Sequence, residues 1–138
     1  AGSAPTASQV TFEKGEAEKA NYRHYRIRQS KGNDDISSLH EVAIRREKRL
    51  ADWGVPDLII IDGGKPQISK VTEILPANIP VVGLAKRLET LVVKKDNKFI
   101  EERLKPPALF LFQRLRDESH RFARRLHHKQ IAKIFKSK

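Results

Sequence analysis

Two residues of the sequence, Asp62 and His120, could carry metal-dependent chemistry. Asp62 follows the apolar run at 58–61 in PDLIIIDGGKPQ, and two glycines come directly after it. Ligands gather at the carboxyl ends of strands in open α/β sheets, and a carboxylate there suits a hard divalent cation that bridges phosphate oxygens. The alternative is that Asp62 only caps a helix that starts near Pro66. A Walker-type phosphate loop is excluded because GGKPQ lacks the spaced glycines and the Lys-Ser/Thr pair.

His120 lies in a predicted helix that carries polar residues along one side. At about 100° per residue, the core side of ALFLFQRLRDESHRFARRL consists of Ala108, Phe112, Leu115, Ser119, Phe122 and Leu126. Gln113, Asp117, His120 and Arg124 then share the opposite side. Neutral imidazole can bind a metal or move a proton near neutral pH, which lysine and arginine cannot do. The alternative is an ordinary solvated helix surface.

A third cluster combines two acids with a basic helix end. Asp34 and Asp35 precede a helix predicted to begin near Ile36, and both are good helix caps. The far turns of that helix carry Arg45, Arg46, Lys48 and Arg49, which could bind phosphates without reading base sequence. Residues 127–138, HHKQIAKIFKSK, look like a basic extension of the last helix, useful for DNA or simply a frayed end.

The elements that position these residues alternate in type along the chain. Alternation around Val10 and Phe12 and around Tyr25 and Ile27 predicts two antiparallel strands. A helix from Ile36 to about Trp53 follows, and the run before Asp62 is apolar on both faces, as in a central strand. Further on we expect a helix over 66–75, a buried strand in IPVVGLAK, a hairpin turning at Asp96 and Asn97, and a long helix after Pro106 and Pro107. This order predicts an α/β fold with a mixed sheet.

The bulk composition favours a polyanionic partner. The 138 residues, consistent with one domain over 1–138, contain 28 Lys and Arg against 17 Asp and Glu, a net charge of +11. Nucleic acid is the first expectation, although a ribosomal protein or a membrane-surface binder would fit the same charge. The chain has no cysteine, which excludes disulfides and thiolate metal sites. Neither a membrane span nor a signal segment is visible, so we expect an intracellular, cytoplasmic protein.

Several segments together resemble one family, the C-terminal endonuclease domain of UvrC, the nuclease subunit of the bacterial nucleotide-excision repair excinuclease. The matching segments, in the family's order across the chain, are GSAPTASQVTFEKGEAEKANYRHYRI, NDDISSLHEVAIRREKR, PDLIIIDGGKPQ, IPVVGLAKRLE and ALFLFQRLRDESHRFA. Any one of them would be a weak signal, whereas their combination is specific. The resemblance implies an RNase H-like fold, a mixed sheet flanked by helices, with an acidic and histidine site for Mg²⁺ or Mn²⁺.

The resemblance also assigns roles to particular residues. It makes Asp62 and His120 the metal ligands and catalytic residues, with Asp35 as a further acidic catalytic position. Contacts to DNA phosphates are expected from Lys65, Arg45, Arg46, Arg121 and Arg124, and support of the site from Glu118 and Asp117. The implied reaction is hydrolysis of a phosphodiester on the 5′ side of a lesion in double-stranded DNA, with damage recognition left to UvrB and, upstream, UvrA.

The sequence departs from the family pattern at its start. Family members carry an aspartate on a strand just before the segment that begins here as GSAPTAS, and the chain given starts after it. The other family modules, a GIY-YIG nuclease, a UvrB-contacting segment and tandem helix-hairpin-helix motifs, are also missing from it. We therefore expect the sheet to lack a strand, the metal to lack a ligand, and incision by this polypeptide alone to be weak or absent.

A second hypothesis is a non-catalytic basic module that binds nucleic acid on the same sheet. The two hypotheses differ at Asp62 and His120: the nuclease requires both side chains to converge on one place, whereas the binding module does not. A third, structural class, such as a ribosomal protein, predicts RNA binding that neither chelators nor Asp62→Asn would change.

Overall fold

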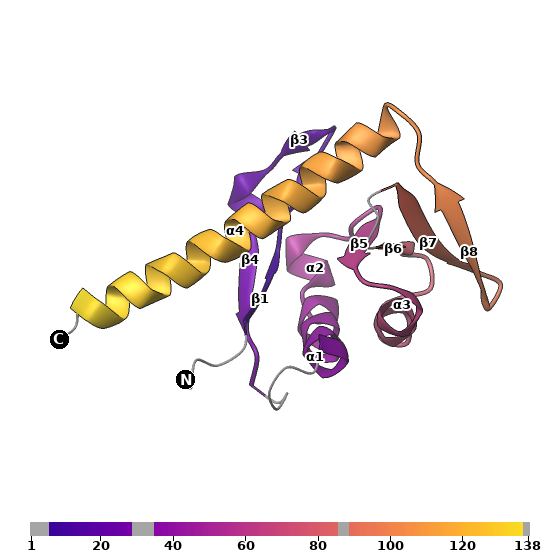
Figure 1. Cartoon of the computed structure of the whole chain (residues 1–138). Coiled ribbons are helices and arrows are strands. Elements are labelled where there is room, and N and C mark those ends of the chain that lie inside the picture. Colours follow the sequence, from indigo (N-terminus) through magenta and orange to yellow (C-terminus); the bar gives the residue numbers. More distant parts are fainter. Residues whose placement is uncertain (1–5, 29–34, 86–88, 137–138) are drawn as a thin grey trace.

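A computed structural model describes residues 6–28, 35–85 and 89–136 of the chain; the side chains of Asp35 and of residues 126–136 lie outside the described part. The elements are β1 (Thr6–Gln9), β2 (Phe12–Glu13), β3 (Glu16–Ala17), the 3-10 helix η1 (Lys19–Asn21), β4 (Arg23–Arg26), α1 (Asp35–Glu47), α2 (Leu50–Trp53), β5 (Ile59–Asp62), α3 (Lys65–Thr72), β6 (Val81–Leu84), β7 (Thr90–Lys95), β8 (Lys98–Arg103) and α4 (Ala108–Lys136). Figure 1 shows α4 as a long rod across one side of the molecule.

The main sheet has four strands in the order β5-β6-β7-β8. β5 and β6 are parallel, with Asp62 opposite Leu84, and the other two pairings are antiparallel. The expected hairpin between β7 and β8 is confirmed, with positive φ angles of 51° and 62° at Asp96 and Asn97, as a tight two-residue turn requires. The predicted α/β class with a mixed sheet flanked by helices is therefore confirmed.

Helices cover both faces of this sheet because its strands are apolar on both sides. On one face, Ile61 of β5 and Val81 of β6 pack against α1 and α3, where Ile68 is fully buried. On the other face, Val82 and Leu84 of β6 pack near Phe112 at the start of α4. The expected two-sided packing of the run before Asp62 is confirmed for Ile59 and Ile60, which contact opposite clusters, whereas Leu58 is exposed.

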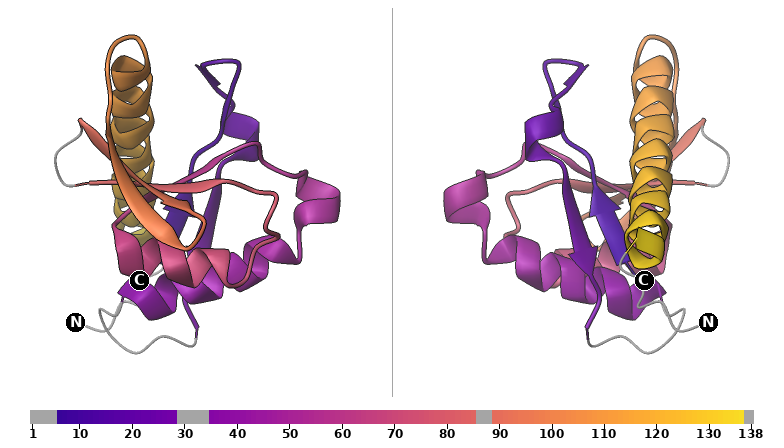
Figure 2. Two further views of the ribbon diagram at one scale, coloured as in Figure 1. Left: turned by 90° about the vertical axis from the view of Figure 1, so that its right-hand side faces the viewer. Right: turned by 90° about the vertical axis from the view of Figure 1, so that its left-hand side faces the viewer.

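The amino-terminal segment forms its own antiparallel pair, β1 with β4, in which Ala7 lies opposite Tyr25. Tyr25 and Ile27 are buried, as their alternation predicts. Figure 2 shows that α4 runs along one side of this pair, while α2 lies on the other side. The pair therefore separates two surfaces of the molecule that can have different functions.

Three sequence expectations are wrong in detail. The connector at 13–21 contains a short hairpin of β2 and β3, whose turn uses positive φ angles at Lys14 and Gly15. The single helix expected up to Trp53 is two helices, α1 and α2. β5 was expected to be central, but among the described residues it pairs only with β6. The periodicity of side chains reports burial well, but it does not report which strands are hydrogen-bonded neighbours.

In the part of the chain that the structure describes, no helix is both long and apolar enough to cross a membrane. α4 is long, but charged side chains recur along it.

Candidate active site

Asp62 and His120 lie next to each other although 58 residues separate them in the sequence. Nε2 of His120 is 3.4 Å from Oδ2 of Asp62. Asp62 is the last residue of β5, and His120 lies in the middle of α4, which crosses that end of the strand. Both side chains remain about half exposed, at 58% for Asp62 and 48% for His120. The convergence that the nuclease hypothesis requires is therefore present, and solvent reaches both groups.

The chain that leaves Asp62 passes close over Gly83 of the neighbouring strand β6. A Cβ at Gly83 of β6 would lie 2.2 Å from the carbonyl oxygen of Gly63, a separation that real Cβ atoms do not show. The chain leaving Asp62 can therefore cross β6 only because residue 83 has no side chain. Within this turn, the backbone N–H of Gly64 donates a 3.0 Å hydrogen bond to Oε1 of Gln67.

The alternative role of Asp62 as a helix cap is wrong. The N-cap of α3 is Gly64, whose backbone N–H bonds to the side chain of Gln67, and the only hydrogen bond described for the Asp62 carboxylate is the one to His120. Pro66, in the first turn, fits a helix start because that turn needs no intrahelical donor. The carboxylate of Asp62 is consequently left to interact with His120.

The pair fits two ligands of one divalent cation in donor type and in spacing. Carboxylate oxygen and imidazole nitrogen both bind such ions at about 2.0–2.2 Å, so two ligands of one ion lie within about 4.4 Å of each other. The observed 3.4 Å is inside that limit. Among the described residues, no group of three or more Asp, Glu or His side chains is placed to hold a metal. The described pair would hold an ion only with additional ligands.

Glu118 and Arg121 flank His120 in sequence and anchor α4 to the amino-terminal segment. The hydroxyl of Tyr22 donates a 2.7 Å hydrogen bond to Oε2 of Glu118, and Arg121 donates to both oxygens of the same carboxylate. The ring of Tyr22 also packs edge-on against Phe122, with the centroids 5.0 Å apart. These contacts fix the rotation of α4 and so help to point His120 at Asp62.

These hydrogen bonds shift two pKa values in opposite directions. The guanidinium of Arg121 and the hydroxyl of Tyr22 lower the pKa of Glu118 from 4.5 to about 2, because both stabilise the charged carboxylate. Burial and the hydrogen bond to Glu118 raise the pKa of Tyr22 from 10.0 to about 12. Glu118 is therefore ionised and Tyr22 neutral throughout the physiological pH range.

The lowered pKa of Glu118 predicts a specific loss of stability in acid. The unfolded chain takes up this proton first, so the contribution of Glu118 is complete above about pH 4.5 and is lost as the pH falls toward about 2. We expect the free energy of unfolding of Glu118→Gln to be below that of the chain at about pH 6 and to approach it at about pH 3. Urea unfolding at both pH values measures this. Glu13→Gln, at an exposed position, controls for the loss of one negative charge; a gap that is equally wide at both pH values would contradict the prediction.

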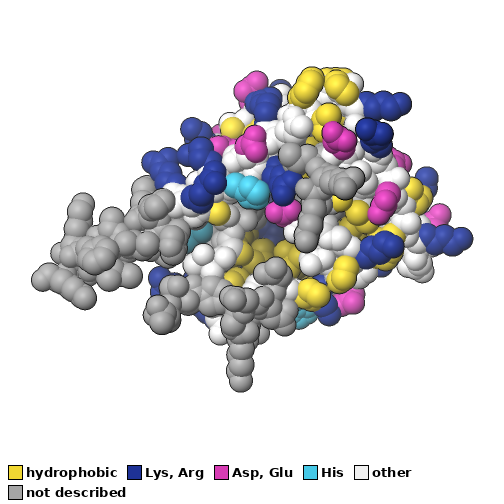
Figure 3. All heavy atoms as spheres, in the orientation of Figure 1, with side chains coloured by type: hydrophobic (Ala, Val, Ile, Leu, Met, Phe, Trp, Pro, Cys, Tyr) yellow, Lys and Arg dark blue, Asp and Glu magenta, His cyan; other side chains and the backbone are white. Residues whose placement is uncertain are grey.

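The remaining predicted residues around this pair occupy exposed positions. Asp117 and Arg124 lie one turn before and one turn after His120 and are exposed with it, so the predicted polar side of α4 is confirmed at these three positions. Gln113 is half-buried, and Ala108, predicted for the core side, is exposed. Lys65 begins α3, and its ammonium lies 5.9 Å from the ring centre of Phe99. Figure 3 shows Lys and Arg side chains gathered along α4 around a histidine. The phosphate contacts of Lys65, Arg121 and Arg124 and the supporting role of Asp117 stay predictions.

The structure places Arg45 and Arg46 away from the Asp62–His120 pair. Arg45 donates to the carbonyl oxygen of Arg26 at 2.7 Å and pairs with Glu41 at 3.3 Å. Arg46 donates to the carbonyl oxygen of Gly54, and its other terminal nitrogen is buried with no hydrogen-bond partner among the described residues. Both guanidiniums are engaged within the protein, an arrangement that does not favour the predicted phosphate contacts.

Two predictions fall outside the described part of the chain. The backbone of Asp35 begins α1, but its side chain is not described, so its catalytic and capping roles stay predictions. The backbone of the basic extension, 127–138, is helical to Lys136, and nothing is described of its side chains.

Sequence reasoning missed two aromatic residues. Tyr22, whose hydroxyl donates a hydrogen bond to Glu118, belongs to no sequence motif that would have identified it. Trp53 lies among arginine side chains that come from three different parts of the chain. A lone tryptophan just after a run of basic residues was a possible signal for the second.

Comparison with known proteins identifies the family. Residues 1–123 match the family described as the UvrC RNAse H endonuclease domain. The chain is 39% identical over 139 residues to UvrABC system protein C of Cytophaga hutchinsonii, a match covering 96% of this chain and 23% of that protein. The protein of the same name from Dehalococcoides mccartyi is 43% identical to the chain over 133 residues, and this match covers 88% of the chain and 22% of that protein.

The chain thus spans about a fifth of the length of the curated relatives that it matches. Its mixed sheet with helices on both faces agrees with the RNase H-like fold of the matched domain. The chain belongs to the UvrC RNase H endonuclease domain family.

Proposed function

We propose that the chain hydrolyses a phosphodiester bond of DNA with the help of a divalent cation, Mg²⁺ or Mn²⁺, held by Asp62 and His120. The observation that carries this proposal is the 3.4 Å separation of these two side chains at the end of β5. A carboxylate and an imidazole that meet while both remain exposed can reach an external substrate, which a buried structural pair cannot do. Family membership supports the reaction class.

The residues of the chain have separable tasks in this reaction. A bound cation supplies charge stabilisation at the scissile phosphate and a water that ionises more readily. Asp62 provides the anionic oxygen, and His120 is placed to act as a ligand or to transfer a proton at Nε2. Glu118, held by Tyr22 and Arg121, keeps the helix of His120 in place.

The biological substrate and partners extend the same proposal. The relatives are named as components of a UvrABC system. We propose incision on the 5′ side of a lesion in damaged double-stranded DNA, in the cytoplasm, with UvrA and UvrB delivering the site. Lys65, three residues after Asp62, and Arg124, four residues after His120, are exposed and suited to contact phosphates, which fix position without reading sequence. Arg121 already donates two hydrogen bonds to Glu118, so a phosphate contact from it would use its remaining N–H groups.

We further propose that the polypeptide as given binds metal weakly and cuts slowly by itself. Two side chains supply two of the several ligands that Mg²⁺ takes, and no third acidic or histidine group joins them among the described residues. Asp35 is a proposed further ligand. An ion held by few protein ligands dissociates easily, so high concentrations of Mn²⁺ should raise the rate.

The test is nicking of damaged supercoiled DNA by the chain with UvrA and UvrB, with Mn²⁺ or with EDTA. We expect nicked circles to accumulate with Mn²⁺ and to stop with EDTA, and the rate without the partners to be much lower. DNA binding that is strong and unaffected by EDTA, with no nicking under any of these conditions, would instead support the non-catalytic binding module.

A further inference from the structure

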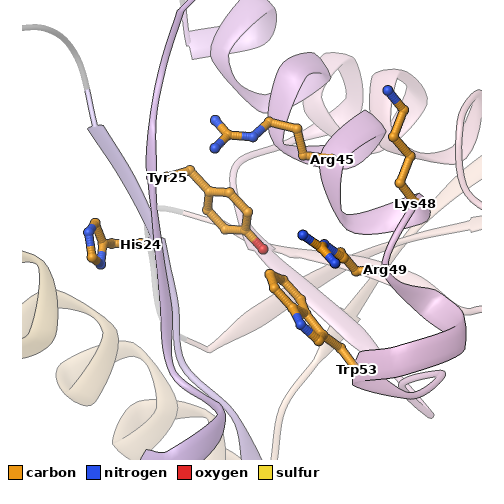
Figure 4. Close-up of a pocket in the computed structure, with 6 residues that line it drawn as sticks. All are labelled: His24, Tyr25, Arg45, Lys48, Arg49 and Trp53. Atoms are coloured by element: carbon orange, nitrogen blue, oxygen red, sulfur yellow. The ribbon is translucent and has the colours of Figure 1, made fainter.

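A small pocket lies between β4 and the segment formed by α1 and α2. Its volume is about 270 Å³, and it is lined by His24, Tyr25, Arg45, Lys48, Arg49 and Trp53, which we call the Trp53 pocket. In Figure 4, Arg49 and Trp53 lie beside the ring of Tyr25 and Arg45 lies above it. Lys48 extends away from that ring, and His24 projects from the other side of β4. The volume is below the range typical of drug-sized ligands and suits a group such as a phosphate.

Trp53 gathers positive charge around the pocket. The guanidinium carbons of Arg23, Arg46 and Arg49 lie 4.7, 5.6 and 5.5 Å from the centre of its ring. Guanidiniums that gather around one ring repel each other, and the attraction of each cation to the negative face of the indole partly offsets that repulsion. The ring therefore holds three cations, from β4, α1 and the turn after α1, close together.

Acidic side chains neutralise only part of this charge. Arg49 pairs with Asp52 at 3.0 Å, and this pair is exposed on both sides. Lys48 forms no ion pair with any residue that the structure describes. One terminal nitrogen of Arg46 is buried and has no hydrogen-bond partner among the described residues. The described side chains around the pocket thus keep an excess of positive charge.

We propose that the Trp53 pocket binds a backbone phosphate of single-stranded DNA, with Lys48 and Arg49 as the direct contacts. The choice of DNA as the ligand rests on the proposed function. The pocket is on the α2 side of the β1–β4 pair, whereas the Asp62–His120 pair is on the side of α4. Double-stranded DNA is too stiff to bend around the β1–β4 pair, whereas single-stranded DNA is flexible enough to do so. The pocket would therefore hold a segment away from the cleaved bond.

The sequence offers a direct readout, because Trp53 is the only tryptophan in the chain. A single-stranded oligonucleotide of about 12 nucleotides would be titrated in EDTA at several salt concentrations while the emission of Trp53 is followed. We expect a saturable change in emission whose affinity falls steeply with salt. Lys48→Ala/Arg49→Ala should lower the magnitude of the slope of log K against log salt by about 0.7, the value for one lost phosphate contact on a single strand.

Lys95→Ala/Lys98→Ala removes the same charge at the β7–β8 turn and should leave the change in emission in place. Because EDTA removes the cation, loss of nicking activity and loss of this binding are separate results. Circular dichroism shows whether each variant is folded.

Four outcomes would overturn the proposal. The first is a constant Trp53 emission while the fluorescence anisotropy of a labelled oligonucleotide reports binding, and the second is an equal change in emission with poly-glutamate. The third is tighter binding of a duplex of the same length, and the fourth is binding of inorganic phosphate as tight as that of the oligonucleotide. The last two would assign the pocket to duplex DNA or to a free anion.

Discussion

Replacing His120 by Ala, or Asp62 by Asn, is expected to lower the rate of metal-dependent nicking by a factor of about 10²–10⁴, the range for loss of a positioned acid–base or ligand group. Each change removes one of the two groups that meet at the end of β5. Asn keeps the shape of Asp and removes its charge, so the loss is electrostatic rather than steric. The rate is measured on damaged supercoiled DNA with UvrA, UvrB and Mn²⁺.

The double variant distinguishes a shared ion from two independent contributions. If both side chains hold one cation, the second substitution removes little that the first has left, so the two effects are far from additive. Asp57→Asn, an exposed acid five residues before Asp62, is the matched control and should retain the rate of the chain. Additive losses, or single variants as active as the chain, would contradict the shared site.

The second large effect is expected at Gly83, where the fold and the site meet. A Cβ there would lie 2.2 Å from the carbonyl oxygen of Gly63 and 3.1 Å from Cδ1 of Ile68. The first neighbour is backbone and the second belongs to a fully buried side chain, so neither can move cheaply. We expect Gly83→Ala to lower the free energy of unfolding by about 1–3 kcal/mol or more and to displace the turn that follows Asp62.

The control for this prediction is Gly64→Ala. A Cβ at Gly64 meets nothing within 4 Å, and the residue does not adopt the left-handed conformation. Urea denaturation of both variants measures the difference, and Mn²⁺ binding reports whether Asp62 has moved. Equal stability of the two variants would contradict the claim that the close approach of Gly63 requires a residue without a side chain at position 83.

Much of this architecture could be predicted from local patterns. The alternation and apolar runs that mark β5, β6 and the β7–β8 hairpin depend on burial and turn chemistry, which neighbouring residues determine. The site pair was predictable in part: the strand end at Asp62 and the helix side of His120 are local features. Their 3.4 Å approach depends on how α4 crosses the sheet, which no local pattern contains.

Features that depend on distant contacts could not be predicted in this way. The break between α1 and α2 carries no glycine or proline signal, and the bond from Tyr22 to Glu118 joins residues 96 positions apart. The guanidiniums around Trp53 come from segments whose meeting is a consequence of tertiary packing. For the same reason, the hydrogen bond from Arg46 to the carbonyl oxygen of Gly54 could not be predicted from the sequence, and the phosphate contact predicted for Arg46 stays a prediction.

The central claim is that Asp62 and His120 hold one cation between them. Anomalous diffraction from crystals of the chain soaked in Mn²⁺ tests it most directly. The account predicts a peak about 2.0–2.2 Å from both the carboxylate of Asp62 and Nε2 of His120, absent in Asp62→Asn. A manganese peak elsewhere on the protein, with Asp62 and His120 still in direct contact, would contradict it.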